Sequence, residues 1–352
     1  MRTRSRIRLF VGLAVVCGVA IVALAAATVL RATQGRAAAD RAVSEDRPQA
    51  RQILSGGDPF AVLRSVDRSH PATYGRVEVA SLHGRTPGRP ALAGPACQRV
   101  AFAAGRGICL DVLGTETSVE VMDARLRVLH RFNVPGVPSR ARVSPDGRWG
   151  GVTTFVVGHA YAKPGQFSTA TTLVDMRTGK PAGDLERDFR FTHDGAVVDA
   201  RSRNYWGLTF AGDGDTFYAT LSFGGHSYLV RGSISARSGR TIHDNVECPS
   251  LSPDGTRIGY KKVIAHDPTV WRFHVLDLAT GRETALAETR SVDDQLAWVD
   301  DQHLVYGDGE RVWMVNADGS GRPQVWMGGA DSPTVDVPRT DIAAAGGQPA
   351  HG

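Results

Sequence analysis

The stretch ARVSPDGRWGGV at residues 141–152 returns in altered form as PSLSPDGTRIGY at residues 249–260. In both copies, a Ser-Pro-Asp-Gly tetrapeptide separates two short runs of mainly apolar residues. Proline presets the backbone for the second position of a type I turn, and glycine takes the left-handed conformation that closes a hairpin with a bulge. Each copy therefore predicts a β-hairpin.

Weaker copies of this hairpin recur along the chain. The five turns are marked by Gly105, Asp146, Asp213, Asp254 and Asp301. A second hairpin follows each first one, as in TLVDMRTGKPAG and HVLDLATGRETAL, and no stretch between residues 74 and 338 has the apolar spacing of an amphipathic helix. A recurring unit of about 40–45 residues with four strands is typical of a propeller blade.

Counting these units predicts an all-β, six-bladed β-propeller. Five complete blades are expected at residues 95–135, 138–186, 205–246, 247–290 and 292–330, with residues 187–204 inserted between the second and the third. Two fragments remain at residues 75–92 and 332–337. We expect them to form a sixth blade from both ends of the propeller segment, because an open ring would leave unpaired sheet edges.

The Ser-Pro-Asp-Gly hairpins and the outer turns of the LDLATGRE type resemble the TolB-like, WD-repeat-like family of six-bladed propellers. The resemblance covers roughly residues 74–338. It implies a propeller on the cell exterior that offers one face to an envelope protein, a peptide or a glycan. The function expected from it is that of a binding module. The alternative is a metal-centred propeller hydrolase of the lactonase type.

The N-terminus predicts a membrane anchor ahead of the propeller. Residues 1–8 contain four Arg, and residues 9–30 contain no charge over a length that spans a bilayer core. A retained helix is favoured over a cleaved signal peptide, whose apolar region is shorter. The expected division is a cytoplasmic tail (1–8), a transmembrane anchor (9–30), a linker (31–70) with a short helix near residues 37–54, an extracytoplasmic propeller (71–338) and a disordered tail (339–352).

Composition and motifs narrow the function further. Outside residues 1–51 the chain carries 32 basic and 33 acidic residues, so no basic surface for nucleic acid is expected. HExxH, CxxC, GxSxG and GxxxxGK[ST] are all missing from the sequence. We therefore identify no catalytic residue and expect no cofactor.

Two sets of residues are candidates for binding. A GHxY pattern occurs twice, and a further His follows at the same position in the next blade; this set is His159, Tyr161, His226, Tyr228 and His266. These residues should share one face with the blade-to-blade connections, as a partner surface, a metal site or a structural brace. The residues expected to line the central channel, at the starts of the inner strands, are Arg99, Arg142, Trp206, Glu247 and Gln295.

The cysteines predict buried thiols. With a turn near Gly105, Cys109 lies opposite Phe102, about five residues or roughly 16 Å from Cys97. A disulfide needs Cα atoms within about 7 Å. We therefore expect Cys97, Cys109 and Cys248 to remain unpaired.

Overall fold

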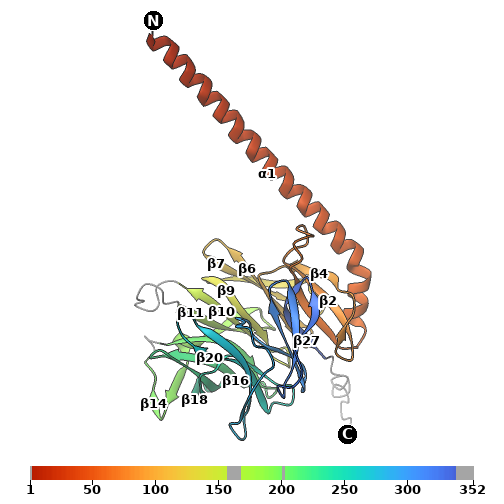
Figure 1. The fold of residues 1–352 in the computed structure, drawn as a ribbon, viewed down its shortest axis with the longest axis vertical. Coiled ribbons are helices and arrows are strands. Elements are labelled where there is room, and N and C mark those ends of the chain that lie inside the picture. The colour runs from red at the N-terminus through yellow and green to blue at the C-terminus, as the bar shows by residue number, and fades with distance from the viewer. Residues whose placement is uncertain (1, 157–167, 200–202, 338–352) are drawn as a thin grey trace, which may run out of the picture.

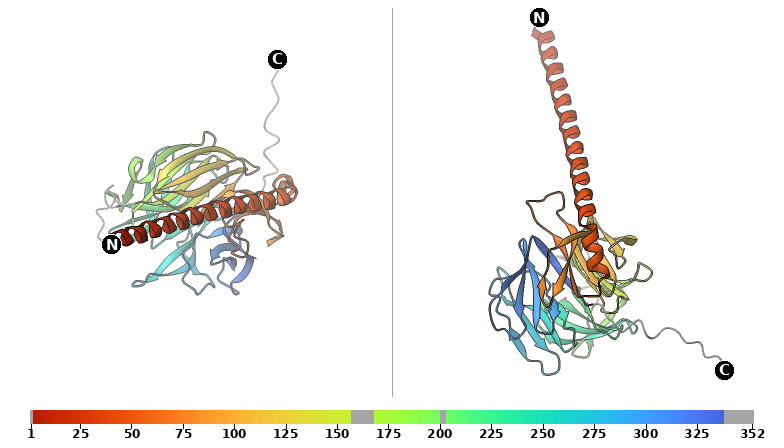
Figure 2. Two further views of the ribbon diagram at one scale, coloured as in Figure 1. Left: turned by 90° about the horizontal axis from the view of Figure 1, so that it is seen from above. Right: turned by 90° about the vertical axis from the view of Figure 1, so that its right-hand side faces the viewer.

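The fold is described from a computed structural model that covers residues 2–156, 168–199 and 203–337. A long N-terminal helix, α1 (Arg2–Ser55), projects from a body made of β-sheet (Figures 1 and 2). The sheets form six blades around a central axis, which confirms the predicted six-bladed propeller. By length and composition, α1 contains a segment able to cross a membrane.

Five blades are continuous in sequence. Blade 1 contains β5 (Arg99–Ala103), β6 (Arg106–Leu113), β7 (Glu116–Met122) and β8 (Val128–Pro135). Blade 2 contains β9 (Val137–Val143), β10 (Trp149–Val156), β11 (Ser168–Asp175) and β12 (Lys180–Asp184). Blade 3 is built on β15 (Asn204–Phe210), β16 (Thr216–Phe223), β17 (His226–Ser233) and β18 (Ser238–Asp244).

The remaining continuous blades have the same order, with the first strand innermost. Blade 4 contains β19 (Glu247–Leu251), β20 (Arg257–Ala265), β21 (Val270–Asp277) and β22 (Glu283–Ala285). Blade 5 contains β23 (Ala297–Asp300), β24 (His303–Asp308), β25 (Arg311–Asn316) and β26 (Gln324–Gly328).

The tetrapeptide turns hold the inner hairpins together through one serine each. In blade 2, the Ser144 hydroxyl donates to Asp146 Oδ1 at 2.5 Å and accepts from the Trp149 amide at 2.9 Å. Gly147 takes a φ of 69°, in the left-handed region that glycine enters without steric cost. Ser252 makes the same two contacts in blade 4. The repeated sequence thus encodes a repeated hydrogen-bonded turn.

The closing blade is assembled from both ends of the propeller. Its inner strand is β27 (Ala330–Asp336), followed by β1 (Phe60–Ser65), β2 (Arg76–His83), β3 (Thr86–Pro87) and β4 (Ala91–Ala96). The predicted sixth blade from both ends is confirmed. The predicted linker is wrong for residues 60–65, because these form β1, paired on one side with β27 and on the other with β2. All six residues of β1 are buried, so the strand lacks the alternation that marks a half-exposed one.

Helix α1 is also longer than expected, since it continues without a break through residues 31–55. Its last turns pack on the closing blade, where Ala50 is buried beside Ile53 and Leu54. Asp46 Oδ2 accepts the Leu92 amide of β4 at 3.0 Å, and Gln49 donates to the Arg89 carbonyl at 3.0 Å. The segment predicted to be a linker therefore contains the docked end of α1, which includes the short helix predicted near residues 37–54, and β1, the second strand of the closing blade.

The expectation for two of the cysteines is wrong, because Cys97 and Cys109 form a disulfide with Cα atoms 5.4 Å apart. The turn is centred one residue earlier than assumed, so Cys109 lies opposite Val100. The chain then bends before β5, and the Gln98 amide donates to the Leu110 carbonyl at 2.6 Å. Both shifts bring Cys97 toward its partner. Cys248 is a buried free thiol.

The insertion lies between blades 2 and 3, as predicted. The described residues between β12 and β15 form the short helix α2 (Leu185–Asp188), which begins two residues before the predicted insertion, and the strands β13 (Arg190–His193) and β14 (Ala196–Val197). β13 pairs in parallel with β18, so blade 3 has six strands. Phe191 anchors this extension, with its ring centroid 4.7 Å from that of Tyr205.

Candidate binding surfaces at the connection face

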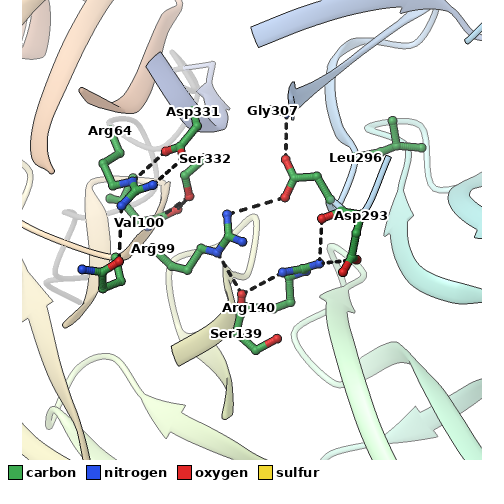
Figure 3. A network of polar contacts seen from close by, with 12 residues as sticks. Arg64, Arg99, Val100, Ser139, Arg140, Asp293, Leu296, Gly307, Asp331 and Ser332 are labelled. Atoms are coloured by element: carbon green, nitrogen blue, oxygen red, sulfur yellow. Dashed lines mark hydrogen bonds and ion pairs between the residues drawn. The ribbon is translucent and has the colours of Figure 1, made fainter. Parts of the chain in front are cut away.

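We call the end of the propeller that carries the blade-to-blade connections the connection face, and the opposite end, which carries the Ser-Pro-Asp-Gly turns, the turn face. At the connection face, charged side chains from several blades interact around the central axis (Figure 3). Arg64 pairs with Asp331, and Arg99 lies 3.6 Å from Asp294. Asp293 forms ion pairs with both Arg140 and Lys261. These residues form the charged mouth of the channel.

One half of the mouth connects the closing blade to blade 1. Arg64 Nε donates to Asp331 Oδ1 at 2.7 Å, and its Nη1 donates to the Cys97 carbonyl at 3.4 Å. The Ser332 hydroxyl accepts the Val100 amide and lies 3.2 Å from the Val100 carbonyl (Figure 3). The mouth thus also holds the ring closed.

The other half is built around Asp293. Its Oδ1 accepts from Arg140 Nη2 at 3.0 Å and from Lys261 Nζ at 2.5 Å. Burial raises the pKa of Asp293, but Lys261 and Arg140 outweigh it and hold this pKa below its usual value. The side chains of Arg140 and Lys261 are buried, whereas that of Asp293 is 59% exposed. The mouth therefore presents a charged carboxylate to solvent.

Glu247 extends this network toward blade 4. It accepts the indole N–H of Trp271 at 2.9 Å and lies 3.8 Å from Lys261 Nζ. The Lys261 ammonium also lies 4.6 Å from the centroid of the Trp271 ring, within cation–π range. Burial raises the pKa of Glu247, although Lys261 and the indole oppose the shift.

A cavity of about 370 Å³ opens beside Glu247 and brings together three of the predicted residues, His226, Tyr228 and His266. Asp244 and Asn245 also line it. Tyr228 packs against two aromatic residues that the sequence did not single out, with ring centroids 4.6 Å from His193 and 4.9 Å from Phe223. His193 belongs to the insertion, whose pairing with β18 could not be read from a repeat pattern. The predicted His159 and Tyr161 lie outside the described residues.

The predicted channel residues occupy different positions. Arg99, Arg142 and Gln295 line a narrow space of about 30 Å³ on the axis. Gln295 donates to the Pro249 carbonyl at 3.0 Å, and Glu247 belongs to the network around Lys261. Trp206 is half-buried on β15, opposite Thr220 of β16.

The chemistry of the connection face suits recognition of a polar partner. It combines an exposed carboxylate, buried cations that fix this carboxylate, and an adjacent cavity with imidazole and phenol groups. In the part of the chain that the structure describes, no group of three or more His, Cys, Asp or Glu side chains is placed to hold a metal ion.

Comparison with known proteins shows which solved structures share this fold. No family model matches the sequence, and no curated protein matches it either. Among solved structures, TolB from Acinetobacter baumannii is similar over 81% of this chain and 69% of its own, at 20% identity and a TM-score of 0.52. A chain of the nidogen/laminin complex is similar over 79% of this chain and 98% of its own, at 12% identity and a TM-score of 0.52. By its fold, then, the chain is a TolB-like six-bladed β-propeller that follows an apolar N-terminal helix.

Proposed function

We propose that the chain is a membrane-anchored, extracytoplasmic propeller that binds an envelope protein, a peptide or a glycan at its connection face. The observation that carries the proposal is the exposed Asp293 carboxylate, held by buried Arg140 and Lys261 beside the cavity of His226 and Tyr228. Because these cations fix the carboxylate, it needs little ordering when a partner donates hydrogen bonds to it.

Two features support the location. The uncharged residues 9–30 lie within α1, and four Arg precede them in the sequence, as expected for an N-terminus that stays inside. The Cys97–Cys109 disulfide is a bond that persists in oxidising compartments. Together they favour a propeller on the outer side of the membrane.

The alternative, a metal-centred hydrolase, is not favoured. That class needs several oxygen or nitrogen ligands that converge on the channel, whereas the carboxylates at this mouth are paired with Arg or Lys. Metal analysis of the purified protein tests this point separately. A stoichiometric divalent metal that is lost in a His226→Ala, His266→Ala variant would support the alternative.

Site-specific photocrosslinking in cells tests the binding proposal. A photoreactive residue at Ser227, in the connection-face cavity, should give a crosslinked product of defined mass. The same residue at Arg148, at the turn face, should not give that product. Asp293→Asn should reduce the Ser227 product at equal protein abundance. Equal crosslinking from both faces would contradict the proposal.

A further inference from the structure

A second cavity, of about 340 Å³, lies in the channel at the end opposite the charged mouth. We call it the turn-face cavity, because Pro145, Gly212 and Pro253 of the inner turns form its rim. Inner strands of all six blades contribute to its wall. Much of this wall is apolar, and the residues that line it include Phe102, Phe210, Trp298 and Val335.

Arg142 forms the inner end of the turn-face cavity. Its guanidinium extends across the channel from blade 2, and Nη2 donates to the Leu296 carbonyl at 3.0 Å and to the Ser250 hydroxyl at 3.4 Å. Arg142 also lines the narrow space of about 30 Å³ on the side of the charged mouth. It therefore lies between the two spaces.

The pairing of Arg142 differs from that of the other channel arginines. Arg64, Arg99 and Arg140 each have a carboxylate partner, in Asp331, Asp294 and Asp293. Arg142 has only neutral partners among the described residues, and its buried Nε has no hydrogen-bond acceptor there. Asp294 does not replace the missing acid, since it pairs with Arg99 and accepts the Gly307 amide.

A partly buried cation without an anion is unfavourable. Burial lowers the pKa of Arg142 to about 10, and Asp294 and Cys248 offset this only in part. The side chain is therefore still charged at neutral pH. A guanidinium in such a place binds a carboxylate more strongly than it would in water, because less hydration is lost on pairing.

We propose that the turn-face cavity binds a small monocarboxylate with an apolar, preferably aromatic, body, its carboxylate on Arg142 and its body against Phe102, Phe210 and Trp298. The volume fits a small molecule and leaves no room for a folded segment. One charge is preferred over two, because the buried carboxyl of Asp336 lines the same cavity. This ligand is independent of the partner proposed at the connection face.

The proposal is tested with 3-phenylpropionate as the probe, by calorimetry on the full chain in lipid nanodiscs. Wild-type protein should bind this carboxylate at least tenfold more tightly than the neutral 3-phenylpropan-1-ol, and more tightly than the dianion phenylsuccinate. Arg142→Met should reduce the affinity for 3-phenylpropionate at least tenfold and leave that for the alcohol unchanged. Arg142→Lys, which keeps the positive charge, should reduce the affinity for 3-phenylpropionate less than Arg142→Met does.

Arg177→Met is the matched control, because Arg177 is an exposed residue on an outer turn of blade 2. It should bind 3-phenylpropionate as wild type does. Arg142→Met should fold at least as stably as wild type, since it removes a partly buried charge that has no ion-pair partner. Equal affinity for the acid and the alcohol in wild-type protein would overturn the proposal whatever the variants do. The proposal would also be overturned by a peptide with a free C-terminal carboxylate that binds tenfold more tightly than 3-phenylpropionate, if amidation of that carboxylate abolishes the difference.

Discussion

Lys261 Nζ and Asp293 Oδ1 lie 2.5 Å apart, yet the side chain of Lys261 is 4% exposed and that of Asp293 is 59% exposed. The pair therefore spans the boundary between the core of blade 4 and the solvent at the channel mouth. In an ion pair with one buried partner, the loss of one charge and the loss of both charges therefore have different effects on stability. Loss of the exposed acid leaves the ammonium buried without its main counter-ion, whereas loss of both charges leaves no such penalty.

The first prediction concerns this asymmetry. Asp293→Asn should lower the free energy of unfolding by about 1–3 kcal/mol, because Lys261 and Arg140 then lose their shared carboxylate. Adding Lys261→Met to Asp293→Asn should recover part of that loss. Urea denaturation of the four proteins in a double-mutant cycle measures both effects. Additive losses would show that the pair is not coupled.

The second prediction is a pH dependence that arises from Glu78. This side chain lies on β2 under the docked end of α1, and burial, with repulsion from Asp46 and Asp331, raises its pKa to about 8. Because the folded pKa is above the unfolded value of about 4.5, the folded state favours the neutral acid. Its contribution to stability is complete below pH 4.5 and is lost as the pH rises through 8.

Glu78→Gln should therefore raise the free energy of unfolding by roughly 2–4 kcal/mol at pH 9 and change it little at pH 4.5. Glu283→Gln is the matched control with the opposite sign. Burial opposes ionisation of Glu283, but Lys262 and His243 outweigh it and lower its pKa to about 2. Its removal should destabilise the protein at neutral pH. Thermal unfolding from pH 4.5 to 9 separates the two cases, and parallel curves for wild type and Glu78→Gln would contradict the assignment.

The third prediction concerns the disulfide. Replacing both Cys97 and Cys109 with Ser should lower the free energy of unfolding by about 3 kcal/mol, as expected when a short closed loop is opened in the unfolded chain. A reducing agent should destabilise wild type by a similar amount and leave the double variant unchanged. Cys248→Ser is the control that keeps the bridge, and a reducing agent should destabilise it as much as wild type.

The fourth prediction concerns the docked end of α1. Ala50→Glu places a charge in the core cluster that Ala50 shares with Val77 and Val79, and it should detach the helix end. Hydrogen exchange should then accelerate at residues 40–55 and at β4. Arg51→Glu changes the neighbouring exposed residue and should leave exchange as in wild type. Unchanged protection in Ala50→Glu would show that the helix end is not needed to cover this blade.

The sequence predicted the blades through their turns, because Ser144 and Ser252 make the same two contacts in each complete tetrapeptide. It did not reveal β1, since a strand buried on both faces has no alternation. The Cys97–Cys109 bridge depended on a turn centred one residue earlier than expected and on a bend before β5.

The candidate site was only partly predictable for a similar reason. His226, Tyr228 and His266 share a cavity because equivalent loops of neighbouring blades meet at one face. The charges that complete the mouth come from places with no counterpart in the repeat. Asp293 precedes the inner strand of its blade, and Arg64 belongs to the unrecognised strand β1. Contacts that join distant segments in this way leave no periodic signal.

The closing blade can form only near the end of synthesis, because its strands come from both ends of the propeller. Arg64 and Asp331 are 267 positions apart, so β1 emerges long before its inner neighbour β27. At about 5–20 residues per second, translation of the intervening chain takes roughly 15–50 s. During that interval one edge of β1 has no native partner, and a nascent chain stalled before residue 330 would remain a ring with an open seam.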